Sequence, residues 1–221
     1  MVTVPTACKY DYDYMQWQFP HEKAVDVALY ASQWVANIAI EKSKGKNLHK
    51  INVWPSGVEL SNEQLFKEIT NSCVIYFKKQ SVNNELLNIL EELNINYNII
   101  EYGKYDFKQY VEALKKSDFV IFYQDCQETQ GLAMAEAWSY NLPTFIKTKV
   151  KDSLKGTAPY LCSQNGEYFS NLEELKKLLL NYKDNPEKFL SKFSPRKYII
   201  ENMSDTKSVE RLLRIFSGIK K

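Results

Sequence analysis

The feature that most constrains the fold is the stretch of residues 117–146, which combines two apolar strands with a short helix of small residues. Residues 118–123 are apolar and prone to form a strand, residues 124–130 are polar, and we expect a helix to begin near Gly131. An Asn-Leu-Pro turn then leads to a second strand at 144–146. The polar loop thus follows the carboxyl end of a strand and precedes a helix amino terminus. Open parallel sheets bind ligands there, and such a terminus suits a phosphate group.

This unit contains two carboxylates, Glu128 in the loop and Glu136 in the helix, with seven residues between them. The run from Glu128 to Pro143 reads ETQGLAMAEAWSYNLP. It resembles the signature of retaining glycosyltransferases of the two-Rossmann-domain GT-B type, in glycosyltransferase family 4 (glycosyl transferases group 1). Sucrose synthase and bacterial mannosyltransferases belong to that family. Gln130 departs from the signature, because the family usually carries an aromatic residue before the glycine.

A second resemblance lies at residues 51–59, INVWPSGVE. In the family, a phrase of this kind marks the crossing into the carboxyl-terminal domain, with Asp where this chain has Glu59. We therefore expect residues 1–50 to hold an amino-terminal arm and a remnant strand and helix of the first GT-B domain. Residues 51–221 would form a Rossmann-like nucleotide-sugar-binding domain. A complete enzyme of this fold has a whole Rossmann domain before residue 24, so we expect a piece of a longer protein or a halved one that needs a partner chain.

Strands and helices are expected to alternate through the rest of the chain. Residues 73–77 and 97–100 have strand character, residues 84–93 carry the leucine stripe of an amphipathic helix, and Asp106 caps a further helix. Strands separated by helical patterns predict right-handed βαβ units. The expected fold is α/β, a Rossmann-like doubly wound parallel sheet that forms one GT-B half, with a helical carboxyl-terminal extension.

Composition excludes several classes of protein. Apolar residues make up 44% of the 221 residues and the net charge is only +2, so no basic field suggests nucleic acid. The cysteines are scattered, with no CxxC pair, which argues against a zinc site and fits a reducing cytosol. Cys73 and Cys126 are expected to be buried free thiols. Neither a signal peptide nor a membrane-spanning run is evident, so a cytoplasmic location is expected.

The apolar stripe of the last predicted helix, residues 207–219, indicates packing on the core or on another domain. The alternative is a peripheral contact with a membrane surface.

The resemblance implies roles for both carboxylates. Glu128 would contact sugar hydroxyls and stabilise developing oxocarbenium charge, which makes it the candidate catalytic residue. Glu136 would accept hydrogen bonds from the ribose hydroxyls of the nucleotide. The alternative is that both are ordinary solvated side chains.

Other donor-binding residues follow from their places beside these two. Main-chain N–H groups near Gln130, Gly131 and Leu132 would hold the diphosphate, because they begin the helix. Lys78 and Lys79, at a strand end, sit where the family places its cations, although they also fit ordinary surface lysines. Tyr102 and Gly103, which end another strand, are candidates to face the base. No metal or other cofactor is expected.

The predicted function is retaining, hexosyltransferase-like transfer of a sugar from a nucleotide-diphosphate sugar to a glycan, lipid or protein acceptor. One alternative is a non-catalytic or partner-dependent nucleotide-binding subunit of a split glycosyltransferase, with a partner subunit or a homo-oligomer completing it. A second alternative is a Rossmann scaffold without enzymatic activity. No nucleic-acid partner is expected.

Overall fold

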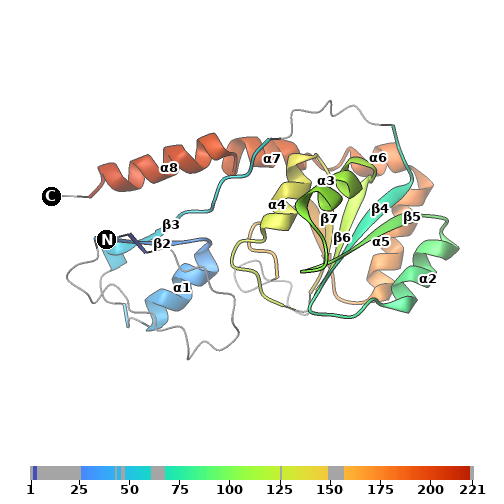
Figure 1. The fold of residues 1–221 in the computed structure, drawn as a ribbon, viewed down its shortest axis with the longest axis horizontal. Helices are drawn as coiled ribbons and strands as arrows, with labels where there is room; N and C mark the ends of the chain where they lie inside the picture. The colour runs from blue at the N-terminus through green and yellow to red at the C-terminus, as the bar shows by residue number, and fades with distance from the viewer. Residues whose placement is uncertain are drawn as a thin grey trace.

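The computed structural model describes residues 2–3, 26–42, 44–45, 48–60, 68–124, 126–148 and 157–219. Figure 1 shows a larger α/β unit, a smaller unit that contains the amino terminus, and a last helix that runs beside the smaller unit. Most of the aromatic-rich start of the chain lies outside the described residues.

The larger unit is built on a five-stranded, fully parallel sheet in the order β5-β4-β6-β7-β8. The first strand of the unit, β4, is therefore internal, and the chain winds outward from it in both directions. In such sheets ligands bind where the winding direction reverses, which here is between β4 and β6. The strands are β4 (Ser72–Lys78), β5 (Asn96–Glu101), β6 (Phe119–Gln124), β7 (Thr144–Lys147) and β8 (Gly166–Phe169).

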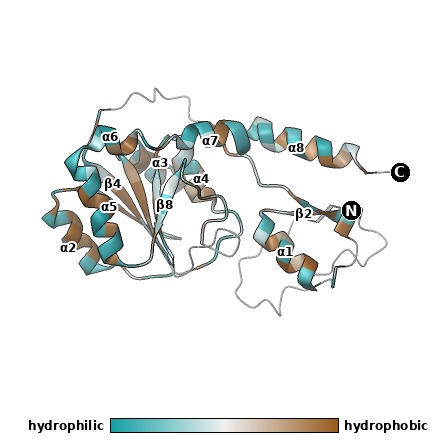
Figure 2. Ribbon diagram, turned by 180° about the vertical axis from the view of Figure 1, so that it is seen from behind, coloured by the Kyte–Doolittle hydropathy of each residue, from teal (hydrophilic) through white to brown (hydrophobic). Residues whose placement is uncertain are grey.

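Helices cover both faces of this sheet, as a doubly wound fold requires. One core cluster joins the sheet to α3 (Phe107–Lys115), α4 (Leu132–Ser139) and α7 (Pro195–Asn202). The other joins it to α2 (Asn84–Glu92), α5 (Leu172–Asp184) and α6 (Pro186–Leu190). Figure 2 shows hydrophobic strands between helices that are hydrophilic over much of their length. The predicted α/β class is confirmed.

Local signals explain where several elements begin. The Asp106 side chain accepts from the Gln109 N–H, and the Gln109 side chain accepts from the Asp106 N–H, so the two form a capping box at the start of α3. The predicted burial of two thiols is confirmed as well, because Cys73 and Cys126 both lie in the interior.

The smaller unit contains a parallel sheet in the order β1-β2-β3, formed by β1 (Val2–Thr3), β2 (Val27–Tyr30) and β3 (Ile51–Val53). Helix α1 (Gln33–Lys42) packs on it through a small apolar cluster that includes Trp34. A short 3-10 helix, η1 (Leu48–Lys50), precedes β3. The domain division at residue 51 stays a prediction. Residue 51 begins β3, which pairs with β2 of the smaller unit.

The last helix, α8 (Asp205–Ser217), differs from expectation. The predicted core packing of its stripe is wrong at three positions, because Val209 is 54% exposed, Leu213 62% and Phe216 38%. Two other stripe residues, Leu212 and Ile219, are half-buried. The helix contacts the body along its other side, where the Ser208 hydroxyl donates to the Pro55 carbonyl and the Trp54 indole donates to the Ser208 carbonyl. Among the described helices, none has the length and apolar character needed to cross a bilayer.

Candidate functional site

A cavity of about 680 Å³ lies at the carboxyl edge of the larger sheet. It brings together eight of the nine residues that the sequence singles out, which are Lys78, Tyr102, Gly103, Glu128, Gln130, Gly131, Leu132 and Glu136. Lys79, in the left-handed region with φ of 56°, does not line it. Both carboxylates therefore face one space, although their roles stay predictions.

The floor of this cavity comes from the two strands at which the winding reverses. Tyr76 of β4 is in register with Phe122 of β6, and Lys78 is in register with Gln124. All four line the cavity. Alternate residues of a strand face the same side of the sheet. Each strand therefore supplies an aromatic residue to the cavity floor and, two positions later, a polar residue at its carboxyl end.

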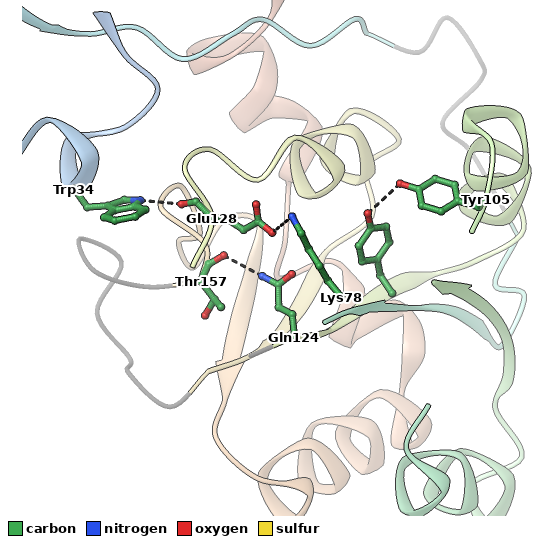
Figure 3. A network of polar contacts seen from close by, with 7 residues as sticks. Trp34, Lys78, Tyr105, Gln124, Glu128 and Thr157 are labelled. Atoms are coloured by element: carbon green, nitrogen blue, oxygen red, sulfur yellow. Dashed lines mark hydrogen bonds and ion pairs between the residues drawn. The ribbon is translucent and has the colours of Figure 1, made fainter. Parts of the chain in front are cut away.

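Lys78 and Glu128 form an ion pair within the site, with 2.5 Å between Nζ and Oε1 (Figure 3). Both side chains are largely buried, at 14% and 9% exposed. Burial raises the pKa of the Glu128 carboxyl, and the Lys78 ammonium opposes that shift. Burial would lower the pKa of Lys78, but the Glu128 charge and hydrogen bond outweigh it and the pKa is raised. Lys78 also lies 4.5 Å from the centre of the Tyr102 ring.

The smaller unit holds the loop that carries Glu128. The Trp34 indole of α1 donates to the Glu128 carbonyl at 2.8 Å, a buried contact that Figure 3 shows. Farther along the loop, the Gln130 amide donates to the Ser56 carbonyl at 2.8 Å and accepts from the Ser56 N–H at 3.0 Å. The unusual glutamine before the glycine thus ties the loop to the segment that connects the two units.

Helix α4 begins at Gly131, which has a φ of +79°. A Cβ there would lie 3.0 Å from the Met134 sulfur, so glycine suits this position for both space and backbone conformation. No described side chain caps the helix. The first N–H groups of an uncapped helix carry partial positive charge, and Gly131, Leu132 and Ala133 line the cavity.

Glu136 lies farther along α4 and faces the same cavity. Burial raises the pKa of its carboxyl. The floor residue Tyr76 and another lining residue, Tyr105, share a hydrogen bond of 3.0 Å between their hydroxyls. Tyr102 and Phe107 form an open rim, at 58% and 60% exposed. The cavity thus combines an uncapped helix, a carboxylate on that helix and exposed rings.

Sequence reasoning did not single out Gln124 as a residue of the cavity. This residue lies at the end of β6 and is only 1% exposed. Its amide donates to the Thr157 carbonyl at 3.1 Å (Figure 3). The available signal was a polar residue that ends an otherwise apolar buried strand, FVIFYQ.

A second hollow, of about 820 Å³, lies between the smaller sheet and α8, and Lys50, Arg211 and Arg214 are among its lining residues. It contains none of the residues singled out from sequence. The cavity between β4 and β6 is the better candidate for the functional site, because sheets of this kind bind ligands where the winding reverses and because its polar groups converge.

No protein-family model and no curated protein matches the sequence. Solved structures do match it. A point mutant of TarM from S. aureus, in complex with fondaparinux, alpha-GlcNAc-glycerol and UDP, has a TM-score of 0.62 at 16% identity. The match covers 86% of this chain and 44% of TarM.

Two further matches have the same character. Anabaena HepE in complex with UDP and glucose has a TM-score of 0.61 at 13% identity, over 87% of this chain and 63% of HepE. The pneumococcal O-GlcNAc transferase GtfA in complex with UDP and GlcNAc has a TM-score of 0.59 at 15% identity, over 94% of this chain and 48% of GtfA. This chain therefore spans less than two thirds of each of these proteins. Its fold is that of one half of the GT-B architecture.

Proposed function

We propose that this chain is the donor-binding half of a retaining glycosyltransferase and that it binds a nucleotide-diphosphate sugar. The observation that carries the proposal is the meeting of Glu128, Glu136 and the uncapped amino terminus of α4 in one cavity at the reversal point of the sheet. Such a cavity suits a nucleotide, because a helix amino terminus can bind a phosphate and a carboxylate can accept hydrogen bonds from a ribose.

The diphosphate would lie against the N–H groups that begin α4, with Lys78 as the nearby cation. Lys78 is already paired with Glu128, so a phosphate would share the ammonium with that carboxylate. Because the site is partly buried, these interactions are stronger than in water. Fixed dipoles and one cation would stabilise the leaving diphosphate, and the proposal requires no metal.

The remaining roles follow from position. Glu136 would accept hydrogen bonds from the ribose, and the rim at Tyr102 and Gly103 would contact the base. Glu128 would face the sugar and stabilise positive charge on its ring in the transition state. Retention of configuration, family 4 membership and a cytoplasmic location belong to the proposal, and the exposed stripe of α8 is compatible with a membrane-surface contact.

TarM, HepE and GtfA were each solved in complex with UDP, which makes UDP the first candidate nucleotide. Isothermal titration of the purified chain with UDP, GDP and ADP tests the proposal directly. We expect saturable one-to-one binding of one nucleotide that the Glu136→Ala variant weakens by about 1–3 kcal/mol. Failure of the folded chain to bind any of the three would refute the proposal.

A partner-dependent subunit is the second candidate, and the contribution of residues outside the larger unit to the cavity favours it. The cavity is also lined by Ala31 and Ser56, which precede the larger unit. Such a subunit would bind the nucleotide but transfer no sugar until a second chain supplies acceptor-binding groups. Co-purification from the native source, followed by a transfer assay with and without the captured protein, separates the two candidates. Transfer by the chain alone would exclude the second.

A further inference from the structure

In the side-chain amide of Gln124, the nitrogen has a hydrogen-bond partner and the oxygen has none among the described residues. Its Nε2 donates to the Thr157 carbonyl at 3.1 Å. Its Oε1 is buried and accepts no hydrogen bond from any residue that the structure describes. Buried side-chain acceptors are normally paired, so this atom calls for an explanation.

The orientation of the amide is determined by its partner. A carbonyl oxygen accepts hydrogen bonds and cannot donate, so only the NH₂ group can face Thr157. Oε1 must then lie on the other side, and Figure 3 shows it turned toward the Lys78 side chain. Because Gln124 is one of the residues that line the cavity, the unsatisfied acceptor lies at the cavity wall.

The surroundings define the chemistry of a ligand group at this point. Oε1 of Gln124 and the carboxylate of Glu128 are acceptors, and the Lys78 ammonium is already paired. Two acceptors would repel a phosphate, which fits the amino terminus of α4 instead. A neutral group that donates hydrogen bonds satisfies both acceptors, and a polyhydroxylated ring offers several such groups.

We propose that Gln124 accepts a hydrogen bond from the transferred sugar, through a ring hydroxyl or the N–H of an acetamido group, and so contributes to sugar specificity. This inference rests on the proposed function, because it assumes a nucleotide sugar in the cavity. It assigns the end of the cavity beside Gln124, Glu128 and Lys78 to the sugar. A sugar that lacks the donor group leaves the acceptor unpaired and binds less well.

The test compares nucleotide with nucleotide sugar, because Gln124 should affect only the second. Affinities of UDP, UDP-glucose and UDP-GlcNAc are measured by calorimetry for the unchanged chain and for Gln124→Met, a variant of similar size whose sulfur is only a weak acceptor. We expect UDP to bind equally well to both. The preferred UDP-sugar should bind about 10-fold more weakly to the variant. Comparison of UDP-glucose with UDP-GlcNAc distinguishes a hydroxyl from an acetamido donor.

Gln80→Met is the matched control, since Gln80 follows the neighbouring strand, accepts from Lys147 and does not line the cavity. It should leave the preference for sugar unchanged. Equal losses of UDP and UDP-sugar in Gln124→Met would overturn the proposal, as would no loss of either, which would mean that water alone satisfies Oε1. An unchanged chain that binds no nucleotide refutes the proposed function itself.

Deoxy-sugar analogues keep the proposal testable if Gln124→Met does not fold. The unchanged chain should lose about 10-fold in affinity at one deoxy or deacetylated position. In a folded Gln124 variant, the same analogue should bring no further loss, because the two changes remove one hydrogen bond. Equal affinity for every analogue would overturn the proposal.

Discussion

The buried polar groups at the two ends of β4 and β6 differ in how fully they are hydrogen-bonded. At the amino end, the Asp118 carboxylate accepts from the Thr70 N–H and hydroxyl, from the Ser72 N–H and from the Tyr182 hydroxyl. Asp118 is only 6% exposed. Its described donors come from the start of β4 and from α5, so this group joins elements of the fold.

At the carboxyl end, the corresponding groups are not saturated. Gln124 keeps one acceptor that no described residue pairs, and the first turn of α4 has no described side-chain cap. A saturated network stabilises a fold, whereas groups left without partners beside a cavity are available to a ligand. The difference separates the end of the sheet that joins elements of the fold from the end at which we propose that the ligand binds.

Asp118→Ala should have the largest effect, and on stability alone. The change removes the carboxylate that accepts from the Thr70 and Ser72 N–H groups and from the buried Tyr182 hydroxyl, so the free energy of unfolding should fall by about 3 kcal/mol or more. For a chain of this size that corresponds to a fall in Tm of roughly 6–12 °C, measurable by calorimetry. Nucleotide affinity of the folded protein should not change. The exposed Asp184→Ala serves as control, and a selective loss of binding in Asp118→Ala would contradict the comparison.

Glu136→Gln should show the opposite pattern. Nucleotide binding should weaken by about 1–3 kcal/mol, because a charged acceptor for the ribose is lost. Burial raises the pKa of Glu136 above its ordinary 4.5, so the ionised form is disfavoured in the folded state. Its contribution to stability is complete below the unfolded pKa and is lost as pH rises through the folded pKa.

The variant should therefore unfold at a higher temperature than the unchanged protein at pH 7, with the gap closing below about pH 4. Thermal unfolding of both proteins at pH 7 and at about pH 4 measures this difference. A variant that is less stable than the unchanged protein at pH 7 would show that Glu136 is a structural group.

Gln130→Leu tests the attachment between the two units. It removes two hydrogen bonds to Ser56, so stability should fall by about 1–2 kcal/mol, and hydrogen exchange at the Ser56 amide should become faster. Gln164→Leu is the matched control, because Gln164 makes one long hydrogen bond, 3.4 Å, to the Ser194 carbonyl. Equal exchange rates at Ser56 in Gln130→Leu and the unchanged chain would disprove the attachment.

Tyr102→Ala should have the smallest effect. The ring is 58% exposed and contacts Lys78, so its removal should change stability by less than about 0.5 kcal/mol. Nucleotide affinity should fall by about 0.5–1 kcal/mol if the ring contacts the base. Tyr102→Phe should retain that affinity, because it keeps the ring. An affinity that Tyr102→Ala leaves unchanged would remove this residue from the site.

Local sequence was enough to predict the elements and part of the site. The alternation of apolar strands with amphipathic helices predicted the α/β class, and cap residues such as Asp106 marked helix starts. Glu128, Gly131 and Glu136 could be placed together from sequence, because a loop and the first turns of one helix keep neighbours in sequence close in space.

Contacts between distant segments were decided by the tertiary structure alone. The ion pair of Lys78 with Glu128 and the hydrogen bonds of Gln130 with Ser56 join residues from separate segments, and the unsatisfied acceptor of Gln124 also depends on how those segments pack. They depend on strand order and register, which result from packing of the whole core and which no local pattern of polar and apolar residues encodes. The exposure of the α8 stripe has the same origin, since an apolar face is buried only where the fold supplies a surface to cover it.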